Sequence, residues 1–164
     1  MTATLLPKQG TLAFFYRHKA LAAGALALLM MALAYVLLGI YPFGDATVLT
    51  GDLNMQYIPY FSHYQRALSG GAGFAYGFDK SMGGGLLGLF AYYVSSPLNL
   101  LYLFVPVGCF PVVANLLLAV KVVLACTFME FYLSRKFPAL GLLGLIPALG
   151  YGFSAFVFVY AQNI

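Results

Sequence analysis

The feature that most constrains this chain is an apolar run from Ala20 to Ile40 that contains no charged residue. A helix needs about 20 apolar residues to cross the hydrocarbon core of a bilayer, and this run is long enough. Arg17, His18 and Lys19 stand directly before it. A cleavable signal peptide is the alternative interpretation. The run is longer than a usual signal-peptide core, which favours a retained membrane helix.

The composition is that of a membrane protein. Hydrophobic residues make up 63% of the chain and charged residues 7%, and the mean hydropathy is +0.92. A soluble domain carries about 25% charged residues. The formal net charge of +4 comes from scattered cations that form no basic surface, so nucleic acid is not an expected partner. We expect an all-α integral membrane protein whose main partner is the lipid bilayer.

Two further runs are apolar enough to span, Pro111–Leu133 and Pro138–Tyr160. A fourth segment, Leu86–Val107, is also apolar, but Ser95-Ser96-Pro97 and Asn99 interrupt it. Cytoplasmic loops carry an excess of Lys and Arg, and that excess exists here only if this segment does not cross. It is therefore expected to be a re-entrant or interfacial hairpin. Lys8, Arg17, Lys19, Arg135 and Lys136 then lie inside, with Arg66 and Lys80 outside.

These spans define an expected organisation for the whole chain, with its N-terminus in the cytoplasm of a bacterial cell. Cys109 then lies outside, and Cys126 lies about 22 Å down the second span, so the two cysteines should not pair. The expected parts are a cytoplasmic N-terminus (1–19), span 20–41, an extracytoplasmic loop (42–110) with surface helix 53–69 and interfacial segment 86–107, span 111–133, a cytoplasmic turn (134–137) and span 138–160.

The expected outer loop concentrates the acids of a chain that has only four Asp and Glu residues. Leu53–Ser69 predicts an amphipathic helix along the membrane surface, with Asp52 as its N-cap. Asp52, Gln56 and His63 fall on one helical face. Pro59 either kinks this helix or marks its true start. The apolar face comprises Leu53, Tyr57, Phe61, Tyr64 and Leu68.

A glycine-rich stretch, "GGAGFAYGFDKSMGGG", follows from Gly70 to Gly85. Backbone amides of such loops can bind phosphate, but the stretch matches neither GxGxxG nor a P-loop. A flexible connector with turns is the simpler interpretation. Asp45 with Asp52 could hold a divalent cation, but two carboxylates without a third ligand are weak evidence, so we expect no metal cofactor.

Two stretches in this order resemble the amino-terminal part of the YfhO family of bacterial membrane proteins. They are "PFGDATVLTGDLNMQYIPYFSHYQRAL" and "GGGLLGLFAYYVSSPLNLLYLFVP", and the similarity covers Tyr41 to Pro106. The resemblance implies a membrane glycosyltransferase of the GT-C type. In that class the first extracytoplasmic loop carries a catalytic acid and two juxtamembrane helices. Family members are far longer, so this chain is expected to be a fragment, inactive alone.

The resemblance also implies the substrates: a polyprenyl-phosphate sugar as donor and a cell-envelope polymer such as lipoteichoic acid as acceptor. The matching acid is Asp52, which is the expected base for the acceptor hydroxyl, with Asp45 as its competitor. Positive charge is needed at the departing phosphate. The candidate substrate-binding residues are Gln56, His63, Arg66, Lys80 and Lys121.

Lys121 sits near the middle of the second expected span, where a charge costs about 3 kcal/mol. Glu130 lies on the opposite side of that helix and is expected to pair with Arg135 or reach the interface. Such an intramembrane lysine, with the broken segment at Ser95–Asn99, also fits a second function, a non-catalytic scaffold or transporter component.

Overall fold

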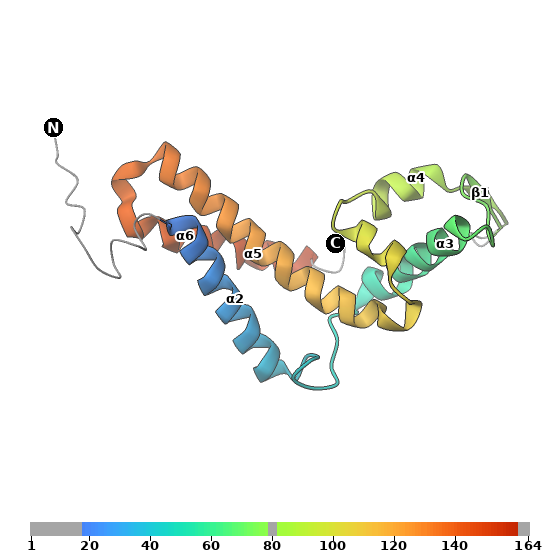
Figure 1. The fold of residues 1–164 in the computed structure, drawn as a ribbon, viewed down its shortest axis with the longest axis horizontal. Coiled ribbons are helices and arrows are strands. Elements are labelled where there is room, and N and C mark those ends of the chain that lie inside the picture. The colour runs from blue at the N-terminus through green and yellow to red at the C-terminus, as the bar shows by residue number, and fades with distance from the viewer. Residues whose placement is uncertain (1–17, 79–81, 161–164) are drawn as a thin grey trace. The chain divides into compact units, whose positions relative to one another are not determined.

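The computed structural model describes residues 18–78 and 82–160, and helices dominate this range (Figure 1). Three helical stretches are long and apolar enough to cross a membrane: Lys19–Leu38, Val107–Lys136 and Pro138–Val159. The prediction of an all-α membrane protein with three spans is confirmed. Segment 86–107, which the sequence left ambiguous, does not form a spanning helix in the described structure.

The described chain divides into two compact units. The first unit contains residues 18–38 and Ala119–Val159, and the second contains Gly39–Leu118. Each unit has its own packing and is described by itself.

The first unit is built from long apolar helices that meet through small residues. Helix α2 (Lys19–Leu38) buries mainly Ala22, Ala23, Gly24 and Ala27. A Cβ on Gly24 would lie 2.5 Å from the Thr127 Oγ1 of helix α5 (Phe110–Lys136), so the two helices approach closely. Small residues allow this approach between membrane helices, where dispersion contacts replace the hydrophobic effect.

The third span agrees in extent with the predicted 138–160, but it consists of three helical pieces rather than one regular helix. It begins as a 3-10 helix, η5 (Pro138–Gly144), in which Gly141 has φ 56° and ψ −129°. Helix α6 (Leu145–Gly152) and helix α7 (Ala155–Val159) follow. A positive φ of this kind suits glycine, and it explains why hydropathy alone, which sees only apolar residues, missed the break.

A buried ion pair lies within the first unit. The Glu130 side chain is fully buried, and its Oε1 is 3.9 Å from the Lys19 Nζ. The same ammonium donates a hydrogen bond to the Gly141 carbonyl at 3.3 Å. The expectation that Glu130 pairs with Arg135 is wrong, because the Arg135 guanidinium instead lies over the Phe131 ring at 4.4 Å.

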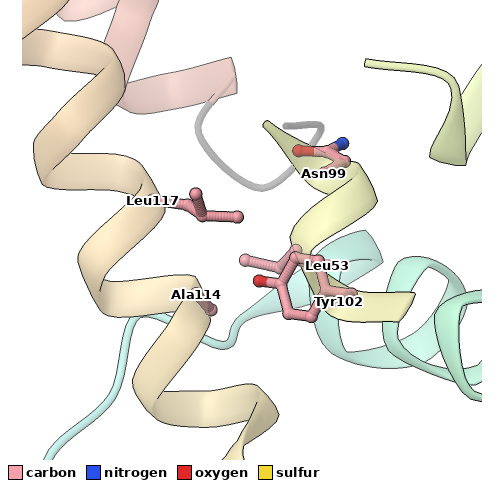
Figure 2. Close-up of a pocket in the computed structure, with 5 residues that line it drawn as sticks. All are labelled: Leu53, Asn99, Tyr102, Ala114 and Leu117. Atoms are coloured by element: carbon pink, nitrogen blue, oxygen red, sulfur yellow. The ribbon is translucent and has the colours of Figure 1, made fainter. Parts of the chain in front are cut away.

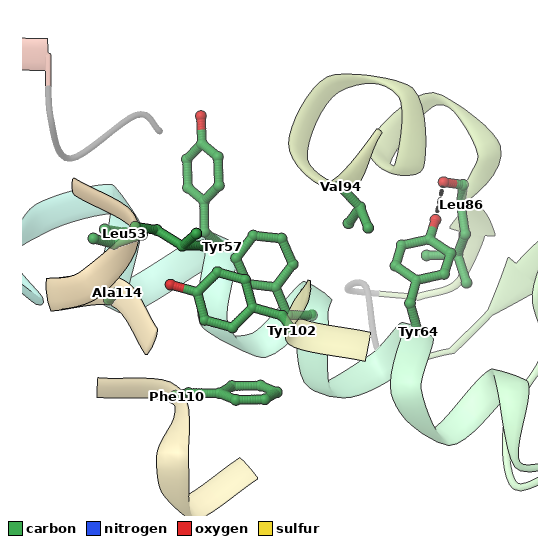
Figure 3. Packing of buried hydrophobic residues seen from close by; sticks show 10 residues of the cluster. Leu53, Tyr57, Tyr64, Leu86, Val94, Tyr102, Phe110 and Ala114 are labelled. Atoms are coloured by element: carbon green, nitrogen blue, oxygen red, sulfur yellow. Dashed lines mark hydrogen bonds between the residues drawn. The ribbon is translucent and has the colours of Figure 1, made fainter. Parts of the chain in front are cut away.

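The second unit has an aromatic core around one bent helix. A π-helix, η1 (Leu53–Tyr57), runs directly into helix α3 (Ile58–Leu68). The buried side of this helix contributes Phe61 together with Leu53, Tyr57 and Tyr64, which Figure 3 shows. The Phe61 and Tyr102 rings stack at 4.1 Å between centroids.

The apolar face predicted for 53–69 therefore exists from Leu53 to Tyr64. It packs against other parts of the protein rather than lying on the membrane surface as predicted. Leu68, the last member of the predicted face, is 58% exposed.

The segment after the glycine-rich stretch folds back as a pair of short helical pieces. Helix α4 (Leu87–Leu89) continues into a second π-helix, η2 (Phe90–Val94). A turn then leads to the 3-10 helices η3 (Asn99–Phe104) and η4 (Val107–Cys109). Tyr102 and Val105 of this return both contact α3, by ring stacking and by a hydrogen bond from the Gln65 amide to the Val105 carbonyl at 2.5 Å.

The described ends of the glycine-rich stretch form a small hairpin rather than only turns. Strands β1 (Tyr76–Gly77) and β2 (Gly84–Gly85) pair antiparallel, with Tyr76 opposite Gly85. A Cβ on Gly77 would lie 2.9 Å from Leu86 and 3.3 Å from His63, so the strand lies closely on those two side chains.

The two cysteines are free, as predicted. Cys109 is exposed and Cys126 is buried. They belong to different units, so each can report on its own unit.

Candidate functional site

A chain of side-chain hydrogen bonds leads to the Asp52 carboxylate. The Gln56 Nε2 donates to the Asp52 Oδ1 at 3.0 Å. The Tyr93 hydroxyl donates to the Gln56 Oε1 at 2.6 Å. Asp52 is exposed, whereas Gln56 and Tyr93 are half-buried. The carboxylate is thus open to solvent on one side and held by protein on the other.

The two π-helices of the second unit meet at this chain. Gln56 belongs to η1 and Tyr93 to η2. π-Turns are rare and occur frequently at functional sites. The hydrogen bond between Tyr93 and Gln56 therefore joins the two segments whose backbone departs from the α-helix.

Aromatic packing fixes the Tyr93 ring from two sides. It meets Tyr57 edge-on at 4.6 Å and an interplanar angle of 87°, and it lies 5.0 Å from Tyr60. Tyr57 is nearly fully buried. The amide of the buried Asn99 also donates to the Tyr93 carbonyl at 3.2 Å, so both the ring and the backbone of Tyr93 are held.

Burial raises the pKa of both Tyr57 and Tyr93 further above neutral than the usual value of about 10. It raises the pKa of Tyr57 to about 12, with smaller contributions from Tyr92, Tyr93 and Asp52. Burial also raises the pKa of Tyr93, with smaller contributions from Tyr60, Tyr92 and Asp52. At neutral pH the Tyr93 hydroxyl is therefore a hydrogen-bond donor to Gln56.

Asp52 does not cap the helix, contrary to the prediction. It has helical backbone angles, φ −63° and ψ −32°, and its side chain makes no capping hydrogen bond. A capping residue needs an extended backbone to turn its side chain onto the free amides. Its carboxylate is instead available for the contact with Gln56 and for a ligand.

His63 does not share an exposed face with Asp52 and Gln56, so this expectation is wrong. Its ring is buried, 3% exposed, and the Nε2 lies 3.0 Å from the Gly73 carbonyl oxygen. That oxygen can only accept, so Nε2 carries the proton. A π-turn holds more residues than an α-turn, and η1 therefore shifts the phase on which the prediction depended.

Asp45, the competing acid, lies exposed in a compact loop after α2. Backbone bonds close this loop: the Tyr41 amide donates to the Ala46 carbonyl and the Ala46 amide to the Gly39 carbonyl, each at 2.9 Å. No side chain among the described residues holds the Asp45 carboxylate as Gln56 holds that of Asp52, so Asp45 lacks the positioning that Asp52 has.

The candidate phosphate contacts are dispersed. Arg66 is exposed in the last turn of α3, about 20 Å along the helix from Asp52 at 1.5 Å per residue. Lys121 is half-buried on α5 in the first unit, apart from the unit that holds Asp52. Lys80 lies outside the described residues. The structure thus brings together Asp52 and Gln56 from the predicted set, and does not join Arg66 or His63 to them.

Two cavities of the described units differ in size and in lining. In the second unit, Leu53, Asn99, Tyr102, Ala114 and Leu117 line a cavity about the size of one water molecule (Figure 2). In the first unit, an open apolar groove of about 430 Å³ is lined by Ala125, Phe128, Met129, Tyr132 and Tyr151.

The described residues contain no group of three or more His, Cys, Asp or Glu side chains that could hold a metal ion. Asp45 and Asp52 are accompanied by no third ligand of these types there. The pair of carboxylates considered from the sequence therefore gains no support as a cation site.

A model of the family described as "Bacterial membrane protein YfhO" matches residues 23–164. The chain belongs to the YfhO family of bacterial membrane proteins. The match covers most of the chain and includes both stretches on which the sequence resemblance rested. Comparisons with curated proteins and with solved structures find no match. Membership of the YfhO family and the candidate spans place the protein in a membrane.

Sequence reasoning missed three residues that organise the second unit of this YfhO-family chain. Tyr93 holds Gln56, and Asn99 holds Tyr93. Asn115 is buried on α5, where its Oδ1 accepts from the Val48 amide at 2.9 Å and from the Thr47 hydroxyl at 3.2 Å. An asparagine inside an apolar helix was a usable signal, because such a side chain needs partners.

Proposed function

We propose that this chain is the amino-terminal part of a membrane glycosyltransferase of the GT-C type. Its donor would be a polyprenyl-phosphate sugar and its acceptor a hydroxyl of a cell-envelope polymer such as lipoteichoic acid. Membership of the YfhO family supports the membrane setting, and the resemblance of the two motif stretches suggests the reaction class.

The observation that carries the proposal is the geometry around Asp52. Its carboxylate is exposed, begins the helix that follows the first span, and is oriented by the Gln56 amide at 3.0 Å. Transfer of a sugar from a lipid phosphate requires a base within hydrogen-bond reach of the attacking hydroxyl. An exposed, oriented carboxylate supplies that group.

In the proposed reaction, Asp52 accepts the proton of the acceptor hydroxyl as its oxygen attacks the anomeric carbon of the sugar. The bond from that carbon to the phosphate oxygen breaks, and the lipid phosphate leaves with the electron pair. Cations must offset the charge on the departing phosphate. Among the described cations, the sequence suggested Arg66 and Lys121. Arg66 belongs to the same unit as Asp52 but lies in the last turn of α3. Lys121 belongs to the other unit.

The test is an assay in membranes that contain the full-length protein of which this chain is the proposed amino-terminal part, with a radiolabelled polyprenyl-phosphate hexose as donor. Label in the extracted envelope polymer is measured for Asp52→Asn and for Asp45→Asn. We expect Asp52→Asn to lower transfer by about 10² to 10⁴, with Asp45→Asn close to the unmodified protein. Full transfer by Asp52→Asn at normal protein level would reject Asp52 as the base, and the reverse pattern would assign that role to Asp45.

We also propose that the N-terminus is cytoplasmic, which puts the second unit on the outer face. An impermeant maleimide added to intact cells should then label the exposed Cys109 and leave the buried Cys126 unmodified. A Cys109→Ser variant controls for the site of labelling. Labelling of Cys109 only after permeabilisation would reverse the orientation.

A further inference from the structure

We propose that Tyr93 is a positioning residue that acts on Asp52 through the Gln56 amide. The inference rests on the proposed function, because it concerns the orientation of the proposed base. It adds a residue that lies outside the predicted set, from a segment 37 residues away from Gln56 in the sequence.

The chemistry of a primary amide explains why Tyr93 matters. The Gln56 side chain has one oxygen that accepts hydrogen bonds and one nitrogen that donates them. An ionised carboxylate only accepts, so Gln56 can hold Asp52 only while its nitrogen faces that carboxylate. The Tyr93 hydroxyl occupies the Gln56 oxygen at 2.6 Å, and this bond fixes the nitrogen toward Asp52.

Tyr93 can perform this task because it is itself held. Its ring packs against Tyr57 and Tyr60, and its carbonyl accepts from the Asn99 amide. Tyr92, its neighbour in the sequence, differs: it is 74% exposed, and its ring contacts Tyr93 at 4.6 Å. The pair provides a matched comparison of a tyrosine that holds Gln56 with one whose hydroxyl makes no hydrogen bond to the described residues.

The hydrogen bond from Gln56 determines which oxygen of Asp52 is available to the acceptor. One carboxylate oxygen accepts from Gln56, which leaves the other oxygen to receive a proton from the acceptor hydroxyl. Correct orientation of a base contributes to the rate of the chemical step more than to substrate affinity. Loss of Tyr93's hydroxyl should therefore lower kcat and leave KM nearly unchanged.

The experiment compares Tyr93→Phe, Gln56→Leu, the double variant and Tyr92→Phe in the transfer assay with the labelled polyprenyl-phosphate hexose. Tyr93→Phe keeps the ring and removes only the hydroxyl. We expect it to lower kcat about tenfold, as does Gln56→Leu. Gln56→Leu removes the hydrogen bond to the charged Asp52, and Tyr93→Phe releases the amide that makes this bond. In the Gln56→Leu background, Tyr93→Phe should have no further effect. Tyr92→Phe should retain the full kcat.

The outcomes separate this inference from the proposed function. If Asp52→Asn is inactive while Tyr93→Phe has the normal kcat, the base stands and the positioning role is overturned. If the two losses multiply in the double variant, Tyr93 does not act through Gln56 and the inference is also overturned. Full transfer by Asp52→Asn overturns both proposals. If the Tyr93→Phe protein is present in the membrane at a low level, Gln56→Leu and Gln56→Asn test the same pair of hydrogen bonds. Asn retains the amide but is too short to reach both Tyr93 and Asp52.

Discussion

The two units of this chain are packed in opposite ways. The first unit buries small residues on its helices, among them Ala22, Ala23 and Ala27, and Gly24 of α2 lies against Thr127 of α5. The second unit buries large aromatic rings, including Phe61, Tyr64 and Tyr102. Lipid tails compete with apolar side chains for membrane helices, so close backbone approach stabilises the first unit. Burial of ring area, as in a water-soluble core, stabilises the second.

The buried polar groups repeat this contrast. In the second unit, the Asn115 side chain makes three hydrogen bonds, including one from its amide to the Tyr41 carbonyl at 3.3 Å. In the first unit, neither oxygen of Glu130 accepts a hydrogen bond from the described residues, and its one cation is 3.9 Å away. In the second unit, hydrogen bonds satisfy the buried polar side chain. In the first unit, the buried carboxylate has, among the described residues, only an ion pair, and close packing of the helices surrounds it.

The largest expected effect is in the aromatic core. Phe61→Ala should lower the free energy of unfolding of the second unit by about 3 to 5 kcal/mol, because it removes a buried ring and leaves a cavity. A cysteine at the buried Ala114, in a Cys109→Ser background, reports this unfolding by its reactivity with a thiol reagent during denaturation in detergent.

The exposed Met55→Ala is the control for this change, with an expected effect within about 0.5 kcal/mol. Cys126 should keep its protection in Phe61→Ala at denaturant concentrations that expose the Ala114→Cys thiol. Simultaneous exposure of both thiols would show that the two units unfold as one and would break the comparison.

A smaller effect is expected from the ion pair of the first unit. Lys19→Met leaves the Glu130 carboxylate buried without its cation, and it should lower the free energy of unfolding by about 3 kcal/mol. Reactivity of Cys126 during denaturation measures it. Adding Glu130→Gln should restore most of the loss, because the uncompensated charge is then removed. Equal losses in the single and double variants would mean that the lysine acts through the Gly141 carbonyl rather than through Glu130.

The smallest effect concerns one methyl group at a helix contact. A Cβ on Gly152 would overlap the Cys126 Sγ and lie 3.2 Å from the Val122 carbonyl. Gly152→Ala should therefore cost about 1 to 2 kcal/mol through overpacking. Gly150 faces open space, so Gly150→Ala should be neutral or stabilise α6 by up to about 1 kcal/mol. If Cys126 is equally protected from a thiol reagent in Gly152→Ala and Gly150→Ala, Gly152 does not pack closely against Cys126 and Val122.

The spans were predictable because bilayer thickness sets a length that apolar residues must fill. The residues at which the spans end were harder to predict. Helix α2 stops at Leu38, before Gly39 with φ 61°, whereas the apolar pattern continued to Tyr41. Helix α5 continues to Lys136, past the predicted Leu133. A hydropathy pattern reports the solvent around a segment and carries no information on the backbone angles that end a helix.

The site was predictable only where its partners are close in the sequence. Asp52 and Gln56 are four residues apart, and helical spacing places them together. His63 was misplaced because a π-turn intervenes. Tyr93 was out of reach, because its contact with Gln56 depends on how two separate segments fold against each other. No periodicity within one segment encodes that contact.

The division of helix α5 between the two units has a consequence for how the protein matches its membrane. Its residues up to Leu118 pack in the second unit, and the part from Ala119 to Lys136 is about 27 Å long at 1.5 Å per residue. Helix α2 is about 30 Å long by the same measure. Both lengths suit a hydrocarbon core of about 30 Å. Asn115 lies before that part of α5, and protein groups of the second unit satisfy its amide, so the extra length of α5 serves the packing of that unit and need not cross the hydrocarbon core.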